Sequence, residues 1–251
     1  MKVKTALIVD NLKIKQWQKL SLENALEKTN IVFILNCKNT FSKKNIFKNF
    51  FYYILNFISL KNEFTRRNKL LVPNAKIINF KSNYNGSRQS LPKNVIKKLK
   101  SQNVNLIIKF GMNLLNIDKH TSGLSILSFH HGNPSKYRGR PAGFYEILND
   151  EKKVGTIVQN ITNKLDAGKI YAFSESRITN YSYKKTAINL YSNSRFLLSK
   201  AIDNFLKQKQ EKISKNGINY KLPGNYKVLR FLFLIFSNLI KKIFYGLFFE
   251  K

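Results

Sequence analysis

Short apolar runs alternate with helix-like stretches along most of this chain, and this alternation constrains the fold more than any other feature. Residues 4–10, KTALIVD, are typical of a buried strand, residues 17–28 are helix-like, and residues 30–37 form a second apolar run. A strand, a helix and a strand in that order favour a βαβ unit with parallel strands. We therefore expect an α/β fold with an open, mainly parallel, Rossmann-like sheet.

Residues 38–71 interrupt the alternation with an aromatic, basic and helix-like segment, which is predicted to be an insertion between strands. The alternation then resumes. The further expected elements are strands at 75–81, 104–111, 124–132, 154–162 and 168–179, helices at 90–102, 143–150 and 183–211, and a polar connection at 217–227. The helix at 90–102 is expected to be N-capped, with a proline early in its first turn.

The predicted organisation has three parts. They are an α/β domain over residues 1–182, a helix and connection over 183–224, and a basic amphipathic tail over 225–251 that extends the fold as helix.

Composition limits the class of protein. Hydrophobic residues make up 43% of the 251 residues, which excludes a disordered chain despite a formal net charge of +32. Lys, Asn and Ile are all abundant, as AT-rich codon usage would give, so the charge has one explanation that involves no ligand. The alternatives are attraction to polyphosphate, to RNA or to an anionic membrane surface. Charge alone does not choose among them.

The sequence lacks a cysteine framework, a secretory signal and a membrane span, and these absences set our expectations for compartment and metal content. The single cysteine, Cys37, excludes an intramolecular disulfide framework and a cysteine zinc cluster. The apolar stretch at residues 6–9 is far shorter than the core of a secretory signal and runs straight into Asp10. No window reaches the roughly 18–20 apolar residues of a membrane span. We expect a cytoplasmic protein without a resident metal.

Open α/β sheets bind ligands outside the carboxyl ends of their central strands. No GxGxxG and no P-loop lies on a strand-to-helix turn, which removes the usual support for dinucleotide or nucleoside-triphosphate binding. The most unusual segment is 128–144, SFHHGNPSKYRGRPAGF, where two histidines leave an apolar strand into a loop. Such a histidine is either a proton-transfer group or a strand-end imidazole that hydrogen-bonds the loop backbone.

A second polar element lies at residues 160–170, NITNKLDAGKI, where Asp166 and Gly168 are expected to form a turn between two strands. An aspartate there either orients and charge-stabilises an imidazole or is an ordinary turn residue, which turn chemistry favours. Taken alone, neither segment decides its own role.

Together the two segments resemble the formyltransferase fold family, which includes methionyl-tRNA, glycinamide ribonucleotide and sugar N-formyltransferases. Its signature is an Asn-x-His-x-Ser-Leu-Leu-Pro-x-x-Arg-Gly loop and a later aspartate in a Leu/Ile-Asp-x-Gly turn. The resemblance covers about residues 104–178 and is carried by His130, Tyr137, Arg138, Gly139, Pro141, Gly155, Thr156 and the run from Leu165 to Ile170. The chain departs at Ser128, where the family has its asparagine, and at 131–135, His-Gly-Asn-Pro-Ser, where the family has Pro-Ser-Leu-Leu-Pro.

The resemblance implies that an amine attacks the formyl carbon of 10-formyltetrahydrofolate and gives a tetrahedral intermediate with an oxyanion. It assigns His130 as a donor to that oxyanion and Asp166 as the group that orients the imidazole and assists proton removal. Ser128 would replace the amide donor with a shorter hydroxyl, with a water filling the gap. We expect His130 and Asp166 within hydrogen-bond reach, directly or through one water, at the carboxyl ends of adjacent strands.

The resemblance also implies where the two substrates bind. The implied folate positions are Phe110, Gly111, Met112 and Leu115 on one side and the segment 160–166, with Asn160 and Leu165, on the other. The implied acceptor positions are His131, Arg138 and Gly139, of which Arg138 either binds an anionic group or braces the loop.

The tail carries a wide apolar helical stripe with basic flanks. The flanking basic residues are Lys227, Arg230, Lys241, Lys242 and Lys251. Three roles stay open: a helix docked on the domain, an interfacial helix on an anionic membrane that the aromatic insertion would join, or a subunit contact. We expect one or two helices that project from the α/β domain or lie along its edge and bind a membrane or a partner.

The leading hypothesis is a formyltetrahydrofolate-dependent N-formyltransferase for a small-molecule amine, with an amino-sugar nucleotide or a related cell-surface precursor as the favoured acceptor. Methionyl-tRNA enzymes carry an additional C-terminal barrel, whereas residues after 179 are expected to be helical, so RNA is disfavoured although the charge would suit it. Glycinamide ribonucleotide enzymes are compact and need neither insertion nor tail. The rival from another class is an inactive module of this fold at a membrane surface. The oligomeric state stays open.

Overall fold

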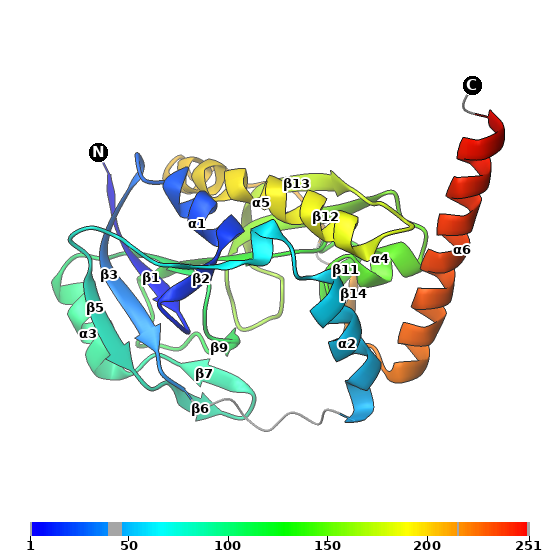
Figure 1. The fold of residues 1–251 in the computed structure, drawn as a ribbon. Helices are drawn as coiled ribbons and strands as arrows, with labels where there is room; N and C mark the ends of the chain where they lie inside the picture. The colour runs from blue at the N-terminus through cyan, green and yellow to red at the C-terminus, as the bar shows by residue number, and fades with distance from the viewer. Residues whose placement is uncertain (1, 40–46, 215, 250–251) are drawn as a thin grey trace.

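A computed structural model describes residues 2–39, 47–214 and 216–249 (Figure 1). Residues 40–46 of the expected insertion and 250–251 of the tail lie outside this range. A seven-stranded sheet with the order β13-β12-β10-β8-β1-β3-β5 forms the centre of the fold. These strands are β1 (Val3–Val9), β3 (Thr29–Cys37), β5 (Lys76–Phe80), β8 (Leu106–Lys109), β10 (Ser125–His130), β12 (Lys153–Asn160) and β13 (Lys169–Arg177).

Six of the seven strands run in one direction, and only β12 is reversed. β5, β3, β1, β8 and β10 pair in parallel, which confirms the expected α/β fold with a mainly parallel sheet. The central strands are almost continuously apolar because helices cover both faces of the sheet. β12 then runs antiparallel to β10, and β13 antiparallel to β12. Because β12 is reversed, the loop after it, which contains Asp166, starts at the edge of the sheet opposite to the carboxyl end of β10.

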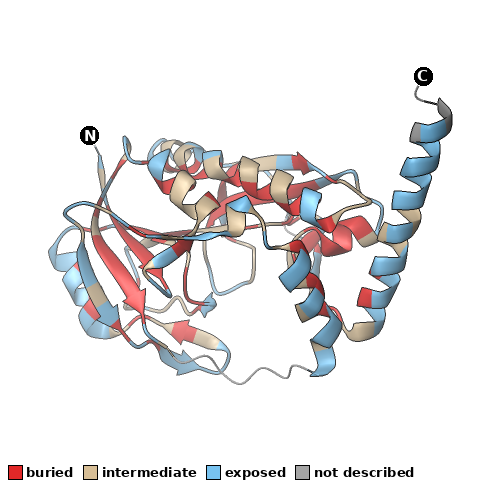
Figure 2. Cartoon of the chain, viewed as in Figure 1, coloured by how far each residue is buried: buried red, intermediate tan, exposed pale blue. Residues whose placement is uncertain are grey.

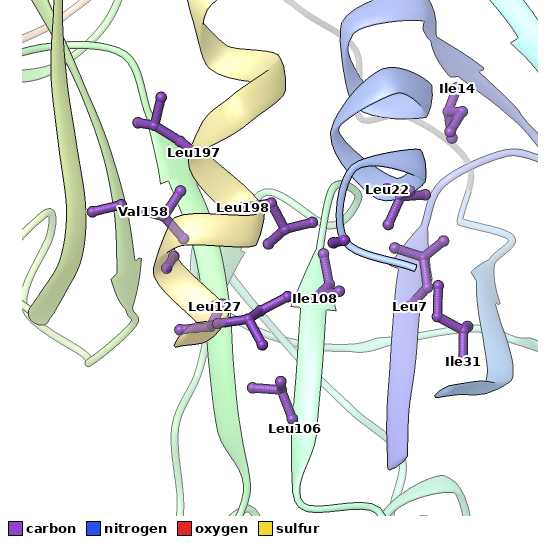
Figure 3. Packing of buried hydrophobic residues seen from close by; sticks show 14 of the residues in the cluster. Leu7, Ile14, Leu22, Ile31, Leu106, Ile108, Leu127, Val158, Leu197 and Leu198 are labelled. Carbon is purple, nitrogen blue, oxygen red and sulfur yellow. The ribbon is translucent and has the colours of Figure 1, made fainter. Parts of the chain in front are cut away.

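The helices form two layers around the sheet. They are α1 (Gln16–Glu23), α2 (Phe50–Ser59), α3 (Lys93–Ser101), α4 (Phe144–Leu148), α5 (Tyr183–Leu206) and α6 (Asn225–Phe249), with 3₁₀ turns η1 (Phe47–Asn49) and η2 (Glu63–Thr65). On one face, Leu22 of α1 and Leu198 of α5 pack against Leu7, Ile108 and Leu127 of the strands (Figure 3). α3 covers the other face.

The start of α3 differs from the expectation. Pro92 occupies the N-cap position without a side-chain hydrogen bond, so the expected side-chain cap was wrong. Ser90 is unavailable for capping because it ends the short strand β7 (Arg88–Ser90), where it pairs with Asn83. The helix therefore begins at Lys93.

Three small sheets flank the main one. They pair β2 (Lys13–Lys15) with β4 (Arg67–Lys69), β7 with β6 (Asn83–Asn85) and β9 (Leu114–Leu115), and β11 (Tyr137–Gly139) with β14 (Ile218–Tyr220). The β11–β14 pair is the important one for the site. It ties the loop that follows His130 to the chain just before α6.

A second core joins α2, α4 and the base of α6. Phe231 of α6 is fully buried and stacks on Phe144 of α4, with ring centroids 4.2 Å apart. Val228 and, from α2, Tyr52 and Leu55 complete this contact. Beyond it, α6 continues away from the α/β domain as a single helix (Figures 1 and 2), which confirms that the tail projects as helix. Among the described residues, no helix has the length and apolarity needed to cross a bilayer.

Phe231→Ala tests whether the base of α6 belongs to the core. Phe231 is 0% exposed and Phe233, two residues on, is 74% exposed. We expect Phe231→Ala to lower the free energy of unfolding by about 3–5 kcal/mol, because it removes a buried ring and leaves a cavity. The matched control Phe233→Ala should change it by less than about 0.5 kcal/mol. Equal effects in urea unfolding would show that α6 does not dock as described.

Candidate active site

A buried histidine–aspartate pair lies at the edge of the sheet. His130 is the last residue of β10, and its Nδ1 lies 3.4 Å from Oδ2 of Asp166. Both side chains are about nine-tenths buried, with 9% and 10% exposure. The expected proximity of these two side chains is confirmed. His130 ends β10, and Asp166 lies in the loop after the adjacent strand β12. Because β12 is antiparallel to β10, the two carboxyl ends lie at opposite edges of the sheet, and the loop folds back to bring Asp166 to His130.

Asp166 is held in place by three segments of the chain. Its backbone has φ 45°, in the left-handed region that aspartate tolerates better than most residues. The backbone N–H of Gly139 donates to Oδ2 at 2.9 Å, and Nε2 of Gln159 donates to Oδ1 at 3.2 Å. Gln159 in turn accepts from the N–H of Gly168 at 3.1 Å. These contacts fix the carboxylate beside the imidazole.

The second nitrogen of His130 faces the loop. Nε2 lies 3.2 Å from the carbonyl oxygen of Tyr137. Both ring nitrogens therefore face oxygen atoms of the protein. A hydrogen bond from Nε2 to a substrate oxygen requires the contact with Tyr137 to open.

A cavity of about 180 Å³ lies beside the pair and has Ser128 and Asp166 in its wall. Its remaining lining residues are Arg88, Lys109, Asn113, Leu114, Leu115, Phe129, Gln159, Ile161, Thr162, Lys164 and Leu165. The cavity thus brings together Ser128, Asp166, Leu115 and Leu165 of the sequence-predicted residues. Pockets that enclose a drug-sized ligand usually measure about 300–1,000 Å³, so this one would hold only part of such a molecule.

Lys109 is a cavity residue that the sequence reasoning missed. It ends β8 and pairs in register with Ser128 of the neighbouring parallel strand, so both side chains lie on the same face. Burial lowers the pKa of Lys109 to about 8, although the carboxylates of Asp10 and Asp166 raise it in part. Within the described residues, no hydrogen bond or direct ion pair engages its ammonium. The available signal was a lysine at the carboxyl end of an otherwise apolar run.

A second, much smaller pocket of about 10 Å³ has His130 in its wall, whereas the larger cavity does not. His130, His131, Arg138, Gly139, Arg140 and Glu146 are among its lining residues. Gly139 has φ 83°, and a Cβ there would lie 2.1 Å from the carbonyl oxygen of Tyr220, so the position requires glycine. The two predicted acceptor residues Arg138 and Gly139 therefore line the same small pocket as the imidazole of His130.

His131 belongs to an aromatic cluster. Its ring lies 5.1 Å from both Trp17 and Tyr191, and its Nε2 is 3.0 Å from the hydroxyl of Ser194. Burial lowers the pKa of His131 to about 3, so the ring is neutral near pH 7. A neutral, enclosed imidazole packs the sheet against α5, and only the edge of the residue borders the small pocket.

Four predicted folate positions shape the loops around the cavity and do not line it. Phe110 packs edge-on against Trp17, with ring centroids 5.7 Å apart. The N–H of Met112 donates to Asp10 at 2.6 Å, and a Cβ on Gly111 would lie 2.4 Å from the backbone nitrogen of Asp10. The amide oxygen of Asn160 accepts from the N–H of Ile126 at 2.7 Å.

Across the described residues, no group of three or more His, Cys, Asp or Glu could hold a metal ion.

Comparison with known proteins places the chain by its fold. No family model and no curated protein matches its sequence. Among solved structures, a phosphoribosylglycinamide formyltransferase from Anaplasma phagocytophilum matches with a TM-score of 0.56 and 12% identity, over 90% of this chain and 96% of that one.

Two further solved structures show the range of activities on this fold. One is an N-formyltransferase from Helicobacter canadensis in complex with folinic acid and dTDP-3-aminofucose. It matches with a TM-score of 0.53 and 16% identity, over 94% of this chain and 81% of that one. The other is a formyltetrahydrofolate deformylase from Pseudomonas putida. It matches with a TM-score of 0.51 and 14% identity, over 83% of this chain and 66% of that one. This chain therefore has the formyltransferase fold. Identities this low show the fold alone.

Lys109→Met tests the burial of the lysine through its pH dependence. Burial lowers the pKa of Lys109 from its ordinary value of 10.5 to about 8 in the folded chain, so between these values the unfolded chain binds more protons. The free energy of unfolding of the wild type should therefore rise with pH across this window relative to Lys109→Met. Below about pH 8 both states are protonated and the variant should be the more stable protein. A melting-temperature difference that stays constant from pH 7 to pH 10 would contradict this.

Proposed function

We propose that this chain is an N-formyltransferase that moves a formyl group from 10-formyltetrahydrofolate to a small-molecule amine. The observation that carries the proposal is the buried His130–Asp166 pair, of which His130 lines the smaller pocket and Asp166 the larger one. The larger pocket contains Ser128 and would take the formyl end of the folate. The smaller pocket, with Arg138, would admit the amine once side chains there move apart.

The chemistry needs a neutral amine and a stabilised oxyanion. The amine nitrogen bonds to the formyl carbon, the carbonyl oxygen takes up negative charge, and the bond from that carbon to N10 of the folate then breaks. The amine loses a proton and the departing N10 gains one. His130 and Asp166 lie together where that proton has to move, and Asp166 stabilises positive charge on the imidazole.

Two groups are placed to replace the amide donor of the family pattern. Ser128 and Lys109 pair across β10 and β8 and line the cavity from the same face. A hydroxyl alone is shorter than an amide, but a protonated lysine reaches further and gives a charge-assisted hydrogen bond. We assign the oxyanion to this pair, with His130 beside it. Ser128 then marks a changed donor set and an active enzyme.

We infer an amino-sugar nucleotide, or a related cell-surface precursor, as the acceptor. One of the solved neighbours is described in complex with dTDP-3-aminofucose, and an anionic nucleotide suits the arginines of the small pocket. Glycinamide ribonucleotide, an anionic amine as well, is the second candidate.

Substitution of the histidine–aspartate pair tests the enzyme hypothesis. His130→Ala and Asp166→Asn should each lower formyl transfer by about 10²–10⁴-fold, because proton transfer and its orientation are lost. The double variant should lose little more than the worse single variant, since the two groups act as a unit. The measurement is formylated product by mass spectrometry with a panel of amino-sugar nucleotides. Absence of folate binding and of turnover in the wild type would support the inactive-module alternative.

Substitution of the two donors tests the proposed oxyanion site. Ser128→Ala should lower transfer by up to about 10²-fold, and Lys109→Met by a comparable factor, as for other lost oxyanion donors. Ser128→Asn should preserve or increase it, because it restores the family's amide. These effects should fall on kcat more than on KM. An unchanged rate in Ser128→Ala would show that Ser128 is only a strand residue, and an unchanged rate in Lys109→Met would remove the lysine from the donor set.

A further inference from the structure

α6 docks with one face and exposes an apolar face on the opposite side. Phe231 is buried, Leu234 and Ile235 are partly buried, Asn238 donates to the carbonyl of Asn180 at 3.3 Å, and Lys242 donates to the hydroxyl of Tyr181 at 2.9 Å. The exposed residues Leu229, Leu232, Phe233, Phe236, Leu239, Ile240, Ile243 and Leu247 form what we call the α6 stripe.

The α6 stripe is long and continuous. At about 3.6 residues per turn its members fall within an arc of about 120°, and at about 1.5 Å per residue the stripe is about 27 Å long. In Figure 2 the outer part of α6 is almost wholly exposed. An exposed apolar surface of this length on a soluble domain indicates an interaction site.

α2 repeats the pattern beside it. Tyr52, Leu55 and Ser59 are buried on one side of the helix. On the other side Phe50, Phe51, Ile54, Phe57 and Ile58 are exposed. We call this second surface the α2 face.

The two helices begin side by side and diverge from there (Figure 1). The side chain of Asn225, at the start of α6, accepts from the N–H of Phe51 at 3.2 Å and donates to the carbonyl of Phe47 at 3.1 Å. Asn49 donates to the carbonyl of Pro223 at 2.8 Å. Both apolar surfaces are therefore fixed to the same corner of the molecule.

Charge identifies the partner. The sequence contains no Asp or Glu in residues 28–62 or in residues 212–249. Basic residues flank both surfaces, with Lys48 and Lys61 beside α2 and Lys227, Arg230, Lys241 and Lys242 along α6. An apolar face whose flanking charged residues are all basic matches a partner surface that has an apolar interior and negatively charged groups at its boundary.

We propose that the α6 stripe and the α2 face bind together to the surface of an anionic lipid bilayer. Interfacial helices of this type lie with their apolar residues among acyl chains and their lysines at the lipid phosphates. A second copy of the chain fits less well, because two cationic rims would meet across the contact. RNA fits less well because it offers phosphates and base edges to a stripe of leucine, isoleucine and phenylalanine.

Vesicle co-sedimentation of the full chain tests this proposal. The probes are phosphatidylcholine vesicles with and without phosphatidylserine, and the stripe variant is Phe233→Ser/Phe236→Ser/Ile240→Ser. The control variant Leu71→Ser/Phe196→Ser/Leu206→Ser removes three similarly exposed apolar side chains elsewhere, at 75%, 54% and 50% exposure. We expect the wild type and control to bind phosphatidylserine vesicles at low salt, more weakly as salt rises, and the stripe variant to bind at least about tenfold less.

Three results would overturn the proposal. The first is no wild-type binding to phosphatidylserine vesicles at low salt. The second is equal binding by the wild type and the stripe variant. The third is a wild-type dimer that the stripe variant converts to a monomer, because the stripe would then contact a second copy. If circular dichroism shows that the stripe variant is unfolded, Phe57→Ser/Ile58→Ser on the α2 face gives the same comparison from the other helix.

Discussion

One buried carboxylate holds the candidate site together. Asp166 accepts from Gly139 of the loop after β10 and from Gln159 of β12, and it lies beside the imidazole of His130. The antiparallel return of β12 makes this possible, because the following loop has to fold back along the sheet to reach the end of β10.

The two pockets are formed by different parts of the fold, the larger one by strands of the main sheet and the smaller one by the β11–β14 pair. The larger cavity is walled by parallel strands whose paired residues Lys109 and Ser128 share a face, so its polar groups are set by sheet register. The smaller pocket depends on the β11–β14 pair and therefore on the chain that leads into α6. Docking of α6 through Phe231 thus stabilises the smaller pocket as well as the second core. If the helix binds a bilayer, the site lies close to that surface.

The sequence predicted the fold and the His130–Asp166 contact because both depend on strong patterns, apolar alternation and a spaced motif. It missed the direction of β12, since an apolar strand has the same composition in either direction. Lys109 was missed because one lysine hardly changes an apolar run, and its role depends on the register with Ser128. The β11–β14 pair could not be predicted, because three-residue strands carry no periodicity. The expected side-chain cap of α3 is absent because Pro92 occupies the N-cap position and has no side-chain hydrogen-bonding group.

The central claim is that the cavity beside Ser128 receives a formylfolate, and calorimetric titration with folinic acid measures this directly. Ser128→Phe places a ring in the cavity and removes the space while His130 and Asp166 themselves stay unsubstituted. We predict saturable binding to the wild type and at least about tenfold weaker binding to Ser128→Phe, with circular dichroism showing that the variant is folded. No binding to the wild type, or equal binding to a folded Ser128→Phe, would contradict the account.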